Sequence, residues 1–217
     1  MQNPTFTADY VWALAVIADR INGGYSKEGE GHFDEQTNQW VQTKKPNKVM
    51  VKEWLREGTM TPTEADITEG QRVRNHFKGF LLKQMAGKIN DFESQALKIA
   101  QKDEFTGRDL LDFAIISCLP QSARRDQERK DLQREVIAST QLTGNVGDKI
   151  IGDIEVVKSH FSAVYGKFRI NARMGESFVD FWFTRELAKG SNLRVEGKIK
   201  NVRGDKTTQL NYVKIRG

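Results

Sequence analysis

Cations recur at every second position of one short segment near the carboxyl end of the chain. Lys167, Arg169 and Arg173 alternate with apolar residues over positions 167–174. In an extended strand this period places the cations on one face and the apolar side chains on the other, where they can fill a core. Because lysines and arginines in such a row neutralise phosphates, the segment predicts a surface for a polyanion.

Aromatic residues follow this cationic segment in the sequence. Over 177–184, Phe178 and Trp182 share one face of a strand, and three apolar residues share the other. If the three fill a core, both rings lie outside beside the cations, where nucleic-acid bases stack for about 1–3 kcal/mol each. A register shifted by one residue would bury Trp182 instead. Two interpretations therefore stand: these rings contact a ligand, or they pack in a core.

Further candidates flank these two segments. The loop 159–165 contributes two more rings to the same end of the predicted sheet, and the strand 193–202 turns three cations outward. The complete set of candidate nucleic-acid contacts is Phe161, Tyr165, Lys167, Arg169, Arg173, Phe178, Trp182, Arg194, Lys198 and Lys200. Together they combine stacking surfaces with phosphate-neutralising charge, which is the chemistry that single-stranded nucleic acid requires.

A second basic cluster lies in a charged segment expected to be helical. Arg125 and Arg129 are four residues apart and share a helix face, from which they could follow a phosphate backbone. Asp126, Glu128 and Asp131 interleave with them. Because this mixture is also typical of a solvated helix with surface salt bridges, the two arginines are secondary candidates for phosphate contacts.

The last seventy or so residues follow the alternating period of strands. Gly175-Glu176 and Gly204-Asp205-Lys206 are typical of tight turns between strands. Five strands are expected, at 149–158, 167–174, 177–184, 193–202 and 207–216. Five short strands in a segment of this length favour a small closed barrel over a sandwich.

The first two thirds of the chain follow a helical period. Expected helices include 8–22, 48–57, 90–102 and 121–139. Residues 23–47 are rich in glycine and charge, and predict a long loop or an irregular hairpin that carries Phe33 and Trp40. The fold class expected is α+β. An α-helical domain over 1–141 precedes a five-stranded barrel domain over 146–217.

One further helix has a clear start signal. Thr61 is predicted to cap it, with Pro62 at the first helical position and Glu64 completing a capping box. Its apolar stripe includes Leu81 and Met85, which are expected to be buried.

Two apolar patterns predict which helical residues form the core. In the helix over 90–102, Phe92 is expected to face inward. Residues 110–119 are apolar nearly all round and are followed by Pro120. That pattern predicts a buried central helix that ends at the proline.

Charge is uneven along the chain of 217 residues. Residues 142–217 carry 14 Lys plus Arg against 8 Asp plus Glu, whereas the rest carries 20 against 21. The asymmetry favours a polyanion-binding module joined to an approximately neutral one.

The single cysteine, Cys118, excludes an internal disulfide and a cysteine-rich zinc site. Because no secretory signal and no membrane-spanning run of about 20 apolar residues is visible, we expect a cytoplasmic protein.

The sequence contains none of the common motifs for binding nucleotide phosphates, for a serine nucleophile or for a helical zinc site. One crowded set of hard ligands lies in the loop: Glu28, Glu30, His32, Asp34 and Glu35. Such a set could hold Mg²⁺ for phosphodiester cleavage, although a solvated polar loop explains the same residues. We therefore expect a protein that is not an enzyme and has no catalytic residue, metal or cofactor.

The carboxyl end also resembles a known family. The run Leu193-Arg194-Val195-Glu196-Gly197-Lys198-Ile199-Lys200, followed by a turn and 208–215, resembles the last two strands of an OB-fold nucleic-acid-binding domain. The resemblance covers 146–217 and implies an OB-fold barrel with a nucleic-acid ligand. The whole chain is more weakly similar to accessory and single-stranded-DNA-binding proteins of bacteriophage replication.

These observations combine into one expected function. The chain is expected to bind single-stranded DNA, with RNA as the alternative, in replication or recombination. Its helical domain is expected to recruit other replication or recombination proteins. The protein is not expected to contact a membrane. Two alternatives are a protein–protein adaptor that uses the barrel as a docking surface and a metal-dependent nuclease that uses the acidic loop. If the chain is phage-encoded, its location is the host cytoplasm.

Overall fold

The computed structural model describes residues 4–216, which separate into two compact units, Met1–Gln127 and Glu128–Gly217. The first unit is helical and the second contains a closed five-stranded barrel, so the chain is of the α+β class. The division falls inside helix α7, Leu119–Ala138. One reason is that the end of α7 belongs to the barrel unit, where Glu135 accepts a 2.6 Å hydrogen bond from Arg173.

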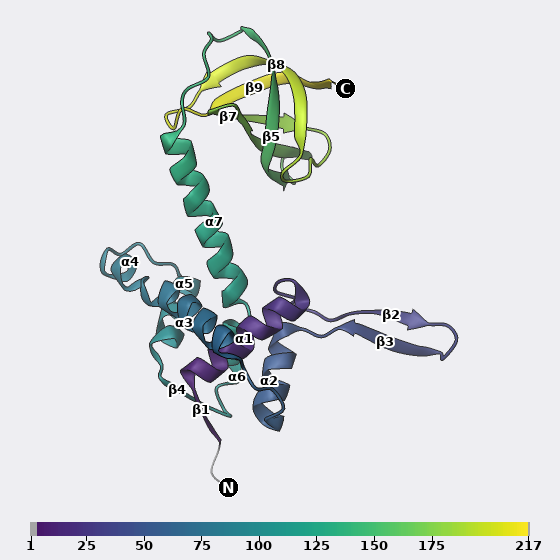
Figure 1. The fold of residues 1–217 in the computed structure, drawn as a ribbon, viewed down its shortest axis with the longest axis vertical. Helices are drawn as coiled ribbons and strands as arrows, with labels where there is room; N and C mark the ends of the chain where they lie inside the picture. Colours follow the sequence, from purple (N-terminus) through teal and green to yellow (C-terminus); the bar gives the residue numbers. More distant parts are fainter. Residues whose placement is uncertain (1–3, 217) are drawn as a thin grey trace. The chain divides into compact units, whose positions relative to one another are not determined.

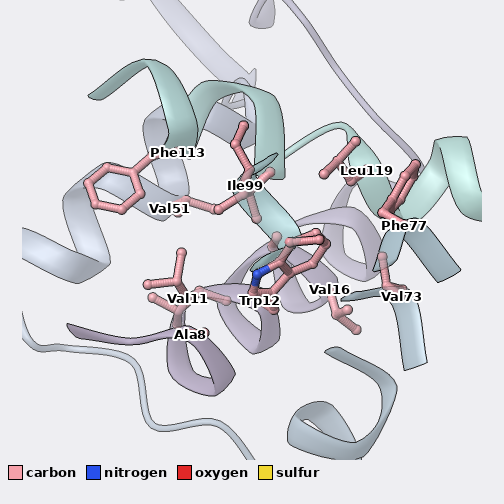
Figure 2. Packing of buried hydrophobic residues seen from close by; sticks show 14 of the residues in the cluster. Ala8, Val11, Trp12, Val16, Val51, Val73, Phe77, Ile99, Phe113 and Leu119 are labelled. Carbon is pink, nitrogen blue, oxygen red and sulfur yellow. The ribbon is translucent and has the colours of Figure 1, made fainter. Parts of the chain in front are cut away.

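Helix α1, Ala8–Asn22, forms the centre of the helical unit and has the bounds that the sequence predicts. Thr7 caps it by accepting a bond from the Tyr10 amide, and Gly23 ends it at a φ of 64°. Eight consecutive residues, 11–18, are buried. Figure 2 shows the fully buried Trp12 among side chains that come from several other helices.

The remaining elements of the helical unit are β1 (Thr5–Thr7), β2 (Glu30–Asp34), β3 (Gln39–Lys44), α2 (Asn47–Glu57), α3 (Glu64–Lys78), α4 (Leu81–Met85), α5 (Asp91–Gln101), β4 (Glu104–Thr106) and α6 (Leu110–Ile116). α2, α3, α6, β1 and β4 pack against α1, whereas the other elements of the helical unit join or extend from them. β1 pairs with β4 in a short antiparallel ribbon. α3 and α5 supply Val73, Phe77, Leu97 and Ile99 to the core.

The start of α3 differs from the sequence prediction by two residues. Thr63, and not Thr61, caps the helix, and Asp66 completes the capping box. The Asp66 carboxylate is almost fully buried and also binds the Arg20 guanidinium at 2.5 Å. This tertiary ion pair holds Asp66 at the third helical position, which decides between two overlapping capping patterns.

The apolar stripe of α3 does not continue to Met85. The helix breaks at Gly79 and a short α4 follows in a new direction, so Leu81 and Met85 are exposed instead of buried. Gly87, at a φ of 63°, then turns the chain towards α5. In α5, Phe92 is also 42% exposed, contrary to its predicted inward position.

The apolar segment 110–119 is not one buried central helix. α6 occupies only its first part, and Leu110 and Leu111 are exposed. Pro120 is the second residue of α7, where its missing amide proton is not needed for a helical hydrogen bond. The proline therefore lies at a helix start and not at a helix end.

Residues 23–47 contain the irregular hairpin that was one of the two expectations. β2 and β3 pair antiparallel, with a register shift at Glu30/Gly31, and form a two-stranded ribbon that projects from the helices of this unit (Figure 1). Phe33 and Trp40 are cross-strand partners and are 53% and 65% exposed. The Trp40 ring covers Gly31, where a Cβ would lie 2.6 Å from its indole nitrogen.

The barrel unit contains five strands close to the predicted ones. They are β5 (Lys149–Ser162), β6 (Lys167–Met174), β7 (Ser177–Phe183), β8 (Asn192–Val202) and β9 (Thr208–Arg216). The closed order is β5-β6-β7-β9-β8, and within it only the β7–β9 pair is parallel. Figure 1 shows this barrel at the carboxyl end of the chain, with β5, β7, β8 and β9 labelled. The sub-order β8-β5-β6-β7 places a returning fourth strand beside the first, which is the Greek-key arrangement.

The inside of the barrel is filled by one set of alternate residues from every strand. Fully or nearly fully buried members are Ile154, Val156, Ile170, Ala172, Val179, Phe181, Val195, Ile199 and Leu210. These buried residues confirm the alternation that the sequence predicts for β6, β7 and β8.

β5 extends four residues beyond its predicted end, because a bulge at Val156/Lys158 lets it continue along β6.

Candidate nucleic-acid interface

The outer side of strands β6 and β7 presents a row of cations and rings, here called the β6–β7 face. The cross-strand register joins His160 to Arg169 and Arg169 to Trp182, so these side chains share one rung on the outside of the sheet. The full face comprises Lys158, His160, Tyr165, Lys167, Arg169, Asn171, Asp180, Trp182 and Arg203. Asp180 is its only carboxylate.

Trp182 lies on this face and not inside the barrel. Its core-facing neighbours Phe181 and Phe183 confirm the register that placed it outside. Its ring is partly exposed and packs against Tyr165, with centroids 4.8 Å apart and planes at 50°. Tyr165 comes from the turn that joins β5 to β6 and is 66% exposed. The two rings form a pair that is supported by the fold and open to solvent.

Phe178 is not part of an exposed aromatic pair, contrary to the sequence prediction. It shares the outer side with Trp182 but is only 4% exposed. The Arg173 guanidinium lies over its ring at 5.7 Å and is bound by Glu155 at 2.8 Å and by Glu135 of α7 at 2.6 Å. Phe178 thus has a structural role next to α7 and is not available to a ligand, whereas Arg173 is held by two carboxylates and keeps 38% of its side chain exposed.

Asp180 organises two arginines on the β6–β7 face. Its carboxylate is fully buried and accepts hydrogen bonds from Arg169 Nε at 3.1 Å and from Arg203 at 2.8 Å. Both arginines keep about a third of their side chains exposed. Arg203 comes from the segment between β8 and β9 and was not a candidate from sequence. The sequence does contain an indication of such a partner, because Asp180 lies on the outer face of β7 and a carboxylate buried there needs a cation beside it.

Two lysines of the face have no carboxylate partner that would compete with a phosphate for their charge. Lys158 and Lys167 are exposed, and within residues 4–216 no carboxylate lies at ion-pairing distance from either ammonium group.

Phe161, the remaining ring at this end, is 51% exposed and packs against Phe168 with centroids 5.2 Å apart. Its partner Phe168 faces the core, so Phe161 lies at the mouth of the barrel beside the face.

The cations of β8 lie on a different surface. β8 pairs with β5 and β9 and not with β6 or β7, so Arg194, Lys198 and Lys200 do not flank Trp182 on the β6–β7 face. All three are exposed, as predicted. Arg194 lies 3.9 Å from Asp153 of β5, whereas Lys198 and Lys200 have no carboxylate partner in the described part of the chain. The ten candidates from sequence are thus divided by barrel closure into separate groups.

Glu196 lies at the centre of this second surface. Hydrogen bonds from Lys149, at 2.8 Å, and from Arg216, at 2.9 Å to its Nε, lower the pKa of the Glu196 carboxyl from 4.5 to about 2. A carboxyl whose pKa is lowered by folding stabilises the protein above its unfolded pKa, and this stabilisation is lost as the pH falls through the folded value.

We expect Glu196→Gln to reduce the Tm at pH 7 and to have progressively less effect as the pH falls from about 4.5 to about 2. The cause is that protonated Glu196 no longer attracts Lys149 and Arg216. Thermal unfolding of both proteins between pH 7 and pH 2 measures the difference. Glu186→Gln, at an exposed position without an ion pair in the described chain, is the matched control. A Tm difference that stays constant with pH would contradict the prediction.

The secondary candidates lie on α7. Arg125 and Arg129 are both exposed there. The interleaved acids have partners of their own, since Asp126 lies 3.2 Å from His76 Nε2, Glu128 lies 3.9 Å from Lys189 and Asp131 pairs with Arg134 at 3.1 Å. This pairing favours the interpretation of α7 as a solvated helix with surface salt bridges.

The acidic residues of the β2–β3 ribbon have local structural partners. Asp34 accepts hydrogen bonds from the Thr37 hydroxyl and from the Gln36 amide in the connecting turn, and the Thr37 bond is the main reason why the pKa of Asp34 is lowered. Glu30 pairs with Lys44 at 3.3 Å. Between residues 4 and 216, no group of three or more His, Cys, Asp or Glu side chains is arranged to hold a metal ion.

Comparisons with known proteins assign neither a family nor a function to this chain. The chain matches no protein-family model, no curated protein sequence and no solved structure. Over the described residues, no helix has the length and apolar character needed to cross a membrane. The residues and geometry of the two barrel surfaces are therefore the basis for any functional conclusion.

Proposed function

We propose that the barrel unit is an OB-fold domain that binds single-stranded nucleic acid, foremost DNA, without catalysis. The observation that carries the proposal is the Trp182–Tyr165 ring pair, which is open to solvent and shares the β6–β7 face with the unpaired Lys158 and Lys167. Rings accept bases by stacking, and the lysines neutralise the phosphates between them.

The topology supports an OB-fold. OB-folds are five-stranded Greek-key barrels, and they bind oligonucleotides on strands two and three together with the loops after strands one and four. The corresponding strands are β6 and β7. The turn after β5 carries Tyr165, and the segment after β8 carries Arg203. The first connection thus places a ring against Trp182 near the end of β7, and the second places a cation against Asp180 in the middle of β7.

Electrostatics favours an anionic ligand on the same face. Four permanent cations, Lys158, Lys167, Arg169 and Arg203, share it with the single buried carboxylate of Asp180. The carboxylate fixes the two guanidinium groups without covering them, because both remain partly exposed. The face therefore carries a net positive charge, and part of each guanidinium group remains open to a phosphate.

An oligonucleotide titration tests the proposal directly. Fluorescence anisotropy of a labelled oligo(dT) with the full chain should show binding that weakens steeply as salt is raised from about 50 to about 200 mM. A duplex of the same length should bind more weakly, because its bases are stacked on each other and cannot reach Trp182. No binding at micromolar protein in low salt would refute the proposal.

The salt dependence should respond to the two unpaired lysines. We expect the double change Lys158→Ala and Lys167→Ala to reduce the slope of log K against log salt by about 1.4, since each phosphate contact on a single strand contributes about 0.7. Lys88→Ala with Lys98→Ala, two exposed lysines of the helical unit, is the matched control and should leave the slope unchanged. Equal slopes for all three proteins would contradict the assignment of phosphate contacts.

We further propose that the helical unit binds partner proteins of replication or recombination. The supporting observation is the exposed Phe33–Trp40 cross-strand pair on the β2–β3 ribbon. A pull-down from nuclease-treated host extract should retain a partner that is lost with Phe33→Ala. Oligonucleotide affinity should be the same for both proteins. A partner that is instead lost on mutation of the barrel would favour the adaptor alternative.

A further inference from the structure

Tyr212 of β9 has a backbone conformation that is uncommon for its residue type. Its φ is 54°, in the left-handed region where the Cβ of an L-residue crowds the following carbonyl oxygen. Its side chain is 80% exposed. Because so little of the ring is covered, packing within the barrel gives small compensation for the backbone strain.

The strain has a clear geometric origin. Lys198 of β8 pairs with Asn211 and Glu196 pairs with Lys214, so Tyr212 and Val213 together oppose the single residue Gly197. Leu210 and Val213 both pack on the barrel core. Two residues, Asn211 and Tyr212, are therefore left on the outside where regular alternation would leave one. Bulges with a left-handed first residue usually carry glycine there.

Cations lie on the same part of β8 and β9 as the exposed ring. Lys198 is opposite Asn211, and Lys214 is two residues from Tyr212 on the same strand. Arg194 and Arg216 are cross-strand partners, and Lys149 and Arg216 both bind Glu196. We call this surface the β8–β9 face, comprising Lys149, Arg194, Glu196, Lys198, Tyr212, Lys214 and Arg216. The face carries five cations and the carboxylate of Glu196, and Asp153 of β5 borders it 3.9 Å from Arg194, so the surface keeps an excess of positive charge.

The β8–β9 face borders the β6–β7 face across one strand. β9 lies between β7 and β8 in the barrel. Phe181 and Leu210 form the last paired rung of β7 and β9, so Trp182 and Tyr212 follow it by one and two residues on adjacent strands. A ligand that lies on Trp182 can therefore continue over β9 without leaving the protein surface.

We propose that Tyr212 is a second base-stacking residue and that the β8–β9 face extends the path of the same single strand. This inference rests on the proposed function and specifies the ligand path. The bulge turns an aromatic ring into solvent among phosphate-neutralising side chains, and a ring in that position can accept a base on its face. A nucleic-acid strand matches the surface in both charge and chemistry.

The test compares Tyr212→Gly with Tyr212→Phe in the full chain, using oligo(dT) of about 6 and about 16 nucleotides, which bracket the site sizes of OB-folds. Tyr212→Gly should raise the Tm by roughly 4 °C, because glycine adopts this φ without strain. It should lower the affinity for the longer oligonucleotide about fivefold or more and leave the shorter one unaffected. Tyr212→Phe keeps the ring and should bind both as the original protein does.

The possible results separate this inference from the proposed function. If the original chain binds neither oligonucleotide, the proposed function is wrong. If the original chain binds, Trp182→Ala weakens binding and Tyr212→Gly leaves the longer oligonucleotide unaffected, only the extended path is wrong. If Tyr212→Gly unfolds the barrel, the double variant Lys198→Ala with Lys214→Ala tests the same path. This pair should lower the salt slope by about 1.4 for the longer oligonucleotide alone, and an unchanged slope would overturn the inference.

Discussion

Replacing Trp182 with alanine is expected to weaken binding of a single-stranded oligonucleotide by about 1–3 kcal/mol, or roughly 5- to 150-fold. The barrel should remain folded, because Trp182 lies outside the core cluster and its ring packs against the exposed Tyr165. Anisotropy titrations give the affinity. Circular dichroism and the Tm show whether the fold is retained.

The helical unit supplies a matched control for this prediction. Trp40 is also an exposed tryptophan, but it lies on the β2–β3 ribbon and not on the barrel. Trp40→Ala should leave the oligonucleotide affinity unchanged. Equal losses for both variants would show that the ring pair on the β6–β7 face is not the stacking site. Collapse of the barrel with Trp182→Ala would show that the tryptophan is needed for folding.

Replacing Asp180 with asparagine should have opposite effects on stability and on binding. Asp180 is fully buried and holds Arg169 and Arg203, so loss of its charge removes two charge-assisted hydrogen bonds. We expect a loss of about 2 kcal/mol in the free energy of unfolding. This is less than the 3–5 kcal/mol typical of a broken buried pair, because the arginines are about a third exposed and regain hydration.

Binding should become tighter in the same variant. The carboxylate no longer competes with phosphate for the two guanidinium groups, so affinity and the salt slope should both rise. Titration well below the Tm separates the two effects. Asp153→Asn is the control, since Asp153 is 76% exposed and lies 3.9 Å from Arg194, and its stability should change by less than about 0.5 kcal/mol. Weaker binding by Asp180→Asn would mean that the arginines must be held by Asp180 to act.

Local sequence patterns predicted much of this protein. Helix α1 begins after Thr7 and ends at Gly23 as expected, because its cap, its apolar period and its terminating glycine lie within one short segment. The strand period also predicted which residues of β6, β7 and β8 face the core. The exposed position of Trp182 followed from that period, since each second side chain of a strand points the same way.

Other features depend on contacts between distant segments, which no local pattern encodes. The cap of α3 is decided by the pairing of Asp66 with Arg20, 46 residues away. Phe178 and Trp182 share one face of β7, yet Arg173 covers the first and leaves the second open. Alternation predicts which side of a strand a residue faces, but burial depends on what else packs on that side.

The amino-acid sequence by itself therefore determined the strands, their inward and outward faces and the excess positive charge of the barrel unit. Only the tertiary structure decided how the charge is divided. Closure in the order β5-β6-β7-β9-β8 places Lys198 and Trp182 on different faces and brings Arg203 to Asp180. It also forces Tyr212 into a left-handed conformation opposite Gly197. The physical reason is that strand pairing and bulges are set by the closure of the whole sheet, whereas the two-residue period is a property of each strand alone.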